Sequence, residues 1–218
     1  GSSKEELLQR LAQVEGIYVP SFYEPVYNDD GTFHTLKPLR QGIPTCINKR
    51  VVADLNQVSY PKEFVVPYVD VVHDRVIAEI MRGCTRGCRF CQAGMIYRPA
   101  RERDPQVLKE QIAQLVQSTG YEEISLSSLS SGDYSQLSSL VRELMEDYQG
   151  CGVGISLPSL RLDSFGVELA QEIQKTRKTG LTFAPEAGTQ RLRDVINKNV
   201  TDEDLRQVVQ GAFSAGWY

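Results

Sequence analysis

The spacing of apolar residues divides the chain into two parts of different character. Residues 4–14, KEELLQRLAQV, have helical spacing and end before Gly16, whereas the next segment is rich in Tyr, Phe, Val and Pro. Proline recurs there too often for a helix, and NDDG at 28–31 between aromatic runs predicts a β-hairpin. We therefore expect residues 1–76 to form a short helix, a hairpin and an extended linker that pack on the remainder of the chain. The leading GSS resembles a cloning scar and is not expected to belong to the fold.

From residue 77 onward, short apolar runs alternate with segments of helical periodicity. The runs predict strands within 75–83, 121–129, 151–159 and 180–186. Helices are predicted over 104–119, 134–148, 165–177, near 188–196, and from 201 onward. Residues typical of helix ends mark these boundaries: Asp104 and Pro105 at one start, Thr201 and Asp204 at another, and Gly120, Gly180 and Gly216 after helical runs.

This alternation predicts an α/β fold with a parallel sheet and right-handed crossovers. Only two residues come after Gly216, where a fifth strand is due. We therefore expect residues 77–218 to be a partial (β/α) barrel, truncated after about four β/α units. The exposed sheet edge at the truncation predicts a dimer that covers it.

Composition and charge exclude several classes of protein. Apolar residues make up 41% of the 218, charged residues 24%, and the net charge is −4, as in an ordinary globular protein without a global basic field. Nucleic-acid binding is therefore not indicated, although local contact stays open. No window approaches the roughly 18 apolar residues of a membrane span. We expect a cytoplasmic protein with no membrane partner.

The chemistry of the chain is concentrated in RGCTRGCRFCQAG at 82–94. Three of its five cysteines, Cys84, Cys88 and Cys91, lie there within eight residues, too close together for a sensible set of mutual disulfides. They come directly after the first strand of the β/α series, at the carboxyl end of the sheet, and the nearby arginines offset the charge of several thiolates. An iron–sulfur cluster with a further ligand from elsewhere suits this loop. The alternative is a zinc-stabilised binding module without catalysis, although only one C-x2-C pair is present. We interpret Cys46 and Cys151 as small buried hydrophobic residues.

The spacing C-x3-C-x2-C after the first strand, with Phe90 before the last cysteine, resembles the signature of the radical S-adenosylmethionine (radical SAM) enzymes. The resemblance implies that Cys84, Cys88 and Cys91 bind three irons of a [4Fe–4S] cluster. The fourth iron would bind the amino and carboxylate groups of SAM. It further implies reductive cleavage of SAM to a 5′-deoxyadenosyl radical that acts on an unknown substrate. Phe90 would pack near the SAM adenine.

Later motifs supply further candidates for contacts with SAM. By the same resemblance, Ser131, Gly132 and Asp133 occupy the place of a Gly-Gly-Glu-like turn that holds the SAM amino group, although a plain strand-to-helix loop is an equal interpretation. Ser156 and Arg161 end the third strand, where Arg161 is either a donor to the SAM carboxylate or a surface residue. Glu186 comes after the fourth strand, either toward SAM or as a helix-start carboxylate.

Taken together, the motifs resemble an uncharacterised bacterial subgroup of radical SAM proteins that carries a cobalamin-binding-like domain upstream. Cobalamin is therefore an expectation for the full-length parent only. A flavodoxin- or ferredoxin-type electron donor is implied as a partner, beside SAM and the substrate. Because later strands are missing, we expect the 218-residue chain to be poorly active or inactive.

Overall fold

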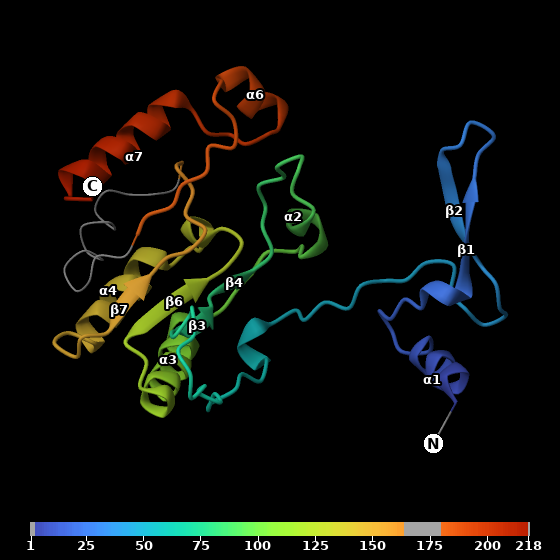
Figure 1. The fold of residues 1–218 in the computed structure, drawn as a ribbon, viewed down its shortest axis with the longest axis horizontal. Coiled ribbons are helices and arrows are strands. Elements are labelled where there is room, and N and C mark those ends of the chain that lie inside the picture. Colours follow the sequence, from blue (N-terminus) through green and yellow to red (C-terminus); the bar gives the residue numbers. More distant parts are fainter. Residues whose placement is uncertain (1–2, 164–179, 218) are drawn as a thin grey trace. The chain divides into compact units, whose positions relative to one another are not determined.

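The computed structural model describes residues 3–163 and 180–217, which fall into two compact units that divide between Ala53 and Asp54 (Figure 1). We expected a division after residue 76, whereas the structure groups residues 54–76 with the second unit. Within that unit, the side-chain carbonyl of Asn56 accepts the backbone N–H of Asp104 at 2.8 Å, and Tyr60 donates to the carbonyl of Ile77. Among the described residues, no helix is long and apolar enough to cross a membrane.

The first unit contains the helix and the hairpin that the sequence predicts. Its elements are α1 (Lys4–Leu11), the 3₁₀ helix η1 (Pro20–Phe22), and the antiparallel strands β1 (Tyr23–Tyr27) and β2 (Phe33–Pro38). Val19, Phe22 and Tyr23 form the small core on which the unit is built. Ser3 belongs to the fold after all, because its side chain and that of Glu6 form a capping box at the start of α1.

The second unit is centred on a parallel sheet with the strand order β3 (Val76–Glu79), β6 (Glu123–Ser127) and β7 (Gly154–Ser156). Val76, Ile124 and Ile155 are in register and buried on one face of the sheet. Two helices lie along the sheet (Figure 1) and share its core, namely α3 (Pro105–Thr119) and α4 (Leu137–Asp147). Successive side chains of a strand point to opposite faces of the sheet. Ser125 and Ser156, which are in register with each other, therefore belong to the face opposite Ile124 and Ile155.

Local signals at the helix ends act as expected. The side chain of Asp104 accepts the N–H of Gln106 at 2.8 Å, and Pro105 opens α3, so this predicted start is confirmed. Gly120 ends α3 in the left-handed conformation. Near the C-terminus, α6 (Gln190–Val195) precedes α7 (Asp202–Ser214), whose capping box pairs Thr201 with Asp204 as predicted.

Two strand predictions differ from the structure. Residues 75–83 form β3 and then a separate strand, β4 (Met81–Arg82), which pairs antiparallel with β5 (Arg101–Glu102). Residues 180–186 form no strand. Pro185 lacks an N–H for a ladder, and Leu181 and Phe183 pack their side chains on a second small core instead. That core consists of buried residues from the segments around α7 and after β7, namely Leu160, Leu162, Val200 and Val208. The helix predicted over 165–177 lies outside the described residues.

The second unit is thus a mixed α/β unit with a three-stranded parallel sheet, consistent with a partial β/α fold. The remaining short elements are the 3₁₀ helices η2 (Leu55–Gln57) and η3 (Ser131–Asp133) and the helix α2 (Ala93–Ile96). Among them, η3 comes after β6, and α2 lies in the cysteine loop. Both therefore border the carboxyl end of the sheet.

Candidate cluster and SAM site

The cysteine loop, residues 83–100, begins and ends at one place because β4 pairs with β5. Gly83 opens it with φ of +92°, a conformation that residues with a side chain rarely adopt. A Cβ built on Gly83 would lie 2.6 Å from the carbonyl oxygens of both Tyr97 and Pro99. The loop therefore closes over its own first residue, which leaves no room for a side chain there.

Each of the three thiols in the loop has its own N–H donor. The backbone N–H of Arg86 donates to Cys84 Sγ at 3.5 Å, and that of Gly94 donates to Cys91 Sγ at 3.4 Å. Cys88 Sγ instead lies 4.0 Å from Nη1 of Arg161, a donor from a different segment. Donors of this kind stabilise thiolates and tune iron–sulfur clusters.

All three cysteines line one cavity of about 240 Å³ in the second unit. Three of the residues predicted from the sequence to contact SAM also line it, namely Phe90, Arg161 and Glu186. The other lining residues are Arg86, Leu129, Ser130, Ser159, Leu160, Ala184 and Lys198. Segments far apart in the sequence therefore meet beside the thiols, and they carry both cationic and anionic side chains.

Four of the predicted residues do not line this cavity. Ser131 is fully buried, and its hydroxyl donates to the carbonyl of Pro158 at 2.7 Å. Gly132 and Asp133 belong to η3, just beyond the lining Ser130. Ser156 ends β7 and pairs with Ser125 on the face of the sheet opposite α3 and α4. Ser131 thus fixes the turn after β6 to the segment after β7.

A chain of ion pairs connects the cysteine loop to the two turns beyond β6 and β7. Arg86 pairs with Asp133, and its Nη1 lies 3.0 Å from Oδ2 of Asp163. The hydrogen bond to Asp133 raises the pKa of Arg86. Burial alone would raise the pKa of Asp133, but the hydrogen bond and charge of Arg86 outweigh it and lower that pKa. Asp133 therefore already has a cationic partner in the protein.

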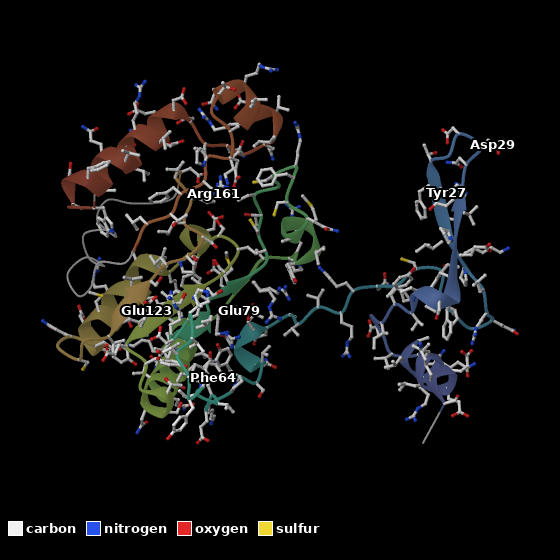
Figure 2. The ribbon with its side chains drawn as sticks, in the orientation of Figure 1. Tyr27, Asp29, Phe64, Glu79, Glu123 and Arg161 are labelled. Carbon is white, nitrogen blue, oxygen red and sulfur yellow. The ribbon has the colours of Figure 1, made fainter. Side chains whose placement is uncertain are left out.

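Arg161 extends the same chain of charges and lies on the segment after β7 (Figure 2). Its guanidinium donates to both carboxylate oxygens of Asp163, from Nε at 2.9 Å and from Nη2 at 3.0 Å. Nη2 also donates to the carbonyl of Lys198 at 2.8 Å. Burial lowers the pKa of Arg161, but Asp163 outweighs burial and raises it. Because Arg161 is only 8% exposed, it is not a surface residue.

Glu186 and Lys198 also line the cavity and pair with each other. Glu186 has φ of +68°, and its carboxylate accepts from Nζ of Lys198 at 3.1 Å. The same Nζ lies 5.9 Å from the centre of the Phe90 ring, within the range of a cation–π contact. Sequence reasoning missed Lys198, since a lone lysine between two helices has no pattern that marks it.

The segment from Val195 to Lys198 also holds the cysteine loop in place. The backbone N–H of Arg89 donates to the carbonyl of Ile196 at 2.9 Å, and the Arg89 guanidinium donates to the carbonyl of Val195. The Asn197 amide donates to the carbonyl of Gly87 at 2.9 Å. Asn197 has φ of +56°, which asparagine tolerates better than most residues.

The prediction for the two remaining cysteines is wrong. Cys46 and Cys151 are both exposed, whereas we expected buried hydrophobic side chains. Cys151 lies in the turn between α4 and β7, where glycines on either side leave little to pack against it. Turn residues of this kind lie on the surface whatever their polarity.

The residues at the cavity fit an iron–sulfur cluster. Within residues 3–163 and 180–217, no three His, Cys, Asp or Glu side chains converge as the ligands of a single ion do. A cluster binds a different iron at each thiolate, so its cysteines need to border a shared space rather than meet at a point. Cys84, Cys88 and Cys91 do border one cavity, with cationic groups beside them.

Comparison with known proteins agrees with this geometry. The model of the radical SAM superfamily matches residues 78–218, which is more than half of the chain. The chain is also 36% identical over 140 residues to the uncharacterized protein MJ0966 of Methanocaldococcus jannaschii. That alignment covers 64% of this chain and 30% of the relative, so the chain spans less than a third of that protein's length. The chain therefore belongs to the radical SAM superfamily.

Proposed function

We propose that the protein binds a [4Fe–4S] cluster through Cys84, Cys88 and Cys91 and cleaves SAM reductively in order to modify a substrate of unknown class. The observation that carries this proposal is the shared cavity, where the three thiols lie beside Phe90, Arg161 and Glu186. Superfamily membership supports the same chemistry. When bound, the cluster supplies the electron that converts SAM to a 5′-deoxyadenosyl radical.

The residues of the chain would bind and orient this chemistry. Gly83 and Gly87, both with positive φ, let the loop adopt its conformation around the thiols, while backbone N–H groups donate to Cys84 and Cys91. Cationic side chains at the cavity offset the charge of three thiolates. An electron donor of the flavodoxin or ferredoxin class would deliver electrons one at a time.

Contacts with SAM are assigned to the side chains around the thiols. Phe90 offers an aromatic ring to the adenine, and 54% of it is exposed. Glu186 accepts hydrogen bonds from SAM hydroxyls while Lys198 offsets its charge. Because Asp133 pairs with Arg86, we assign it to positioning the cysteine loop, and an acceptor role toward the SAM amino group would require Arg86 to move.

Anaerobic reconstitution with iron and sulfide tests the proposal. We expect a broad absorbance band at about 400 nm, typical of [4Fe–4S] clusters, and loss of that band in Cys88→Ala. Cys151→Ala is the matched control, because this cysteine is exposed and lies outside the cavity. Stoichiometric zinc and no cluster would support the zinc-binding alternative and overturn the proposal.

Activity is tested separately on the full-length protein. With dithionite as the reductant, SAM cleavage should release 5′-deoxyadenosine from the reconstituted wild type and not from Cys88→Ala. A loaded cluster without any cleavage of SAM would refute the proposed reaction while leaving the cluster assignment intact.

A further inference from the structure

We propose that Arg161 tunes the reduction of the cluster by donating to the sulfur of Cys88. The inference rests on the proposed function, since it requires a cluster on the three thiols. It assigns Arg161 as a positioning and redox-tuning residue, in addition to any contact with SAM. The observation behind it is the 4.0 Å distance between Nη1 of Arg161 and Cys88 Sγ.

The guanidinium of Arg161 is held so that this nitrogen faces the sulfur. Asp163 engages Nε and Nη2 through its two carboxylate oxygens, and the carbonyl of Lys198 accepts a further bond from Nη2 at 2.8 Å. A planar guanidinium fixed at two of its nitrogens has its third nitrogen fixed as well. The orientation of Nη1 toward Cys88 is therefore set by contacts away from the sulfur.

Asp163 is itself fixed from the other side by Arg86 of the cysteine loop, whose Nη1 lies 3.0 Å from its Oδ2. The carboxylate thus joins the loop that holds Cys88 to the arginine that approaches it. Asp163 therefore helps to position Nη1 of Arg161 relative to the loop that carries Cys88. Charge-assisted hydrogen bonds are shorter than neutral ones, so the contact should tighten when Cys88 binds iron as a thiolate.

The three thiols are not equivalent toward an added electron. Cys84 and Cys91 accept from backbone N–H groups, and the charge of Arg86 also acts on Cys84, whereas Cys88 accepts directly from the guanidinium of Arg161, a residue that is 8% exposed. Reduction adds one electron from the external donor to the cluster and breaks no bond. A cationic donor beside one sulfur stabilises the added negative charge, and burial limits screening by water. Arg161 therefore makes the cluster easier to reduce.

A redox titration of the reconstituted protein measures this effect. The reduced cluster is followed by electron paramagnetic resonance while the potential is lowered with dithionite in the presence of mediators. For Arg161→Gln we expect the ratio of reduced to oxidised cluster at a fixed potential to fall about tenfold, equivalent to about 59 mV for one electron.

Arg89→Gln is the matched control. It removes the same charge from the residue next to Cys88, but the Arg89 guanidinium donates to the carbonyl of Val195 and not to a sulfur. Equal shifts of the reduction potential in Arg89→Gln and Arg161→Gln would overturn the proposal, because the loss of any positive charge near the cysteine loop would then explain both. If Arg161→Gln binds no iron, Arg161→Met, which is uncharged and has no N–H donor, takes its place, and an unchanged potential in that variant overturns the proposal. Absence of iron in the wild type would instead refute the proposed function itself.

Discussion

Substitution of Gly83 by alanine should disrupt the cysteine loop more than its small size suggests. Gly83 has φ of +92°, and a new Cβ would lie 2.6 Å from two backbone carbonyl oxygens, those of Tyr97 and Pro99. Neither oxygen belongs to a flexible side chain, so relief requires the loop backbone to move. Since Gly83 precedes Cys84 directly, that movement would displace the first of the three thiols.

The size of the effect can be worked out by comparison with two other glycines. Gly120 has φ of +70° and open space around it, and Gly87 has φ of +76° with its nearest side-chain atoms at 3.5 and 3.6 Å. Alanine in a left-handed conformation costs roughly 1–2 kcal/mol, offset by about 0.4–1 kcal/mol from the less flexible unfolded chain. By the same two principles, Gly120→Ala and Gly87→Ala should each lower the free energy of unfolding by about 1 kcal/mol. Gly83→Ala adds an overpacking cost of about 1–3 kcal/mol and should lose about 2–4 kcal/mol in total.

Urea denaturation of the three variants measures these differences. The chain has a single tryptophan, Trp217, which packs on the second small core of the same unit, so its fluorescence reports on that unit. The iron bound after anaerobic reconstitution should fall in Gly83→Ala and stay near the wild-type value in Gly87→Ala. The same free energy of unfolding and the same iron content in Gly83→Ala and Gly87→Ala would refute the reasoning from close packing.

Four further predictions concern other parts of the second unit and the surface cysteines. Breaking the ion pair of Arg86 with Asp133 should cost about 1–3 kcal/mol, and a double-mutant cycle with Arg86→Gln and Asp133→Asn should show coupling between them. The pKa of Asp133 is lowered in the folded protein, so the ionised carboxylate stabilises the fold above its usual pKa, and this stabilisation is lost as the pH falls below it. Between about pH 6 and pH 3, the free energy of unfolding should therefore fall less in Asp133→Asn than in the wild type. Leu140→Ala should cost about 2–5 kcal/mol in thermal or urea unfolding, since Leu140 is fully buried in the main core, and a smaller loss would contradict that packing. A thiol reagent should modify only Cys46 and Cys151 while the cluster is bound and all five cysteines after the cluster is removed; protection of Cys151 in the native chain would contradict its exposure.

Local sequence signals predicted the parts of the fold whose causes are local. The N-cap at Asp104, the capping box at Thr201 and the hairpin around 28–31 depend on residues a few positions apart, and the structure contains all three. The prediction of a strand at 180–186 was wrong because strand formation depends on contacts that are not local. A strand exists only when another backbone pairs with it, and an apolar run such as LTF can bury its side chains without such pairing.

The same distinction applies to the candidate site. Cys84, Cys88 and Cys91 were found from their spacing, because a cluster loop is a local feature. For Asp133 the sequence left two interpretations equal, a contact with SAM or a plain loop residue, and spacing did not reveal that it pairs with Arg86 of the cysteine loop. Lys198 was missed because it lines the cavity together with Cys84 and Phe90, which lie more than 100 positions away in the sequence.

The hold of Asn197 on the cysteine loop has a consequence for how the protein is made. The carbonyl of Gly87 and the N–H of Arg89 are bound by Asn197 and Ile196, which lie more than 100 positions downstream. A nascent chain that has emerged only as far as β7 already exposes all three thiols, yet the Asn197 side chain and the Ile196 carbonyl that hold their loop have not emerged. Long-range closure of this kind comes late in folding. We therefore expect iron insertion to come after translation of the cysteine loop rather than to accompany it, with the emergence of residues 195–198 as the earliest point at which the loop is secured.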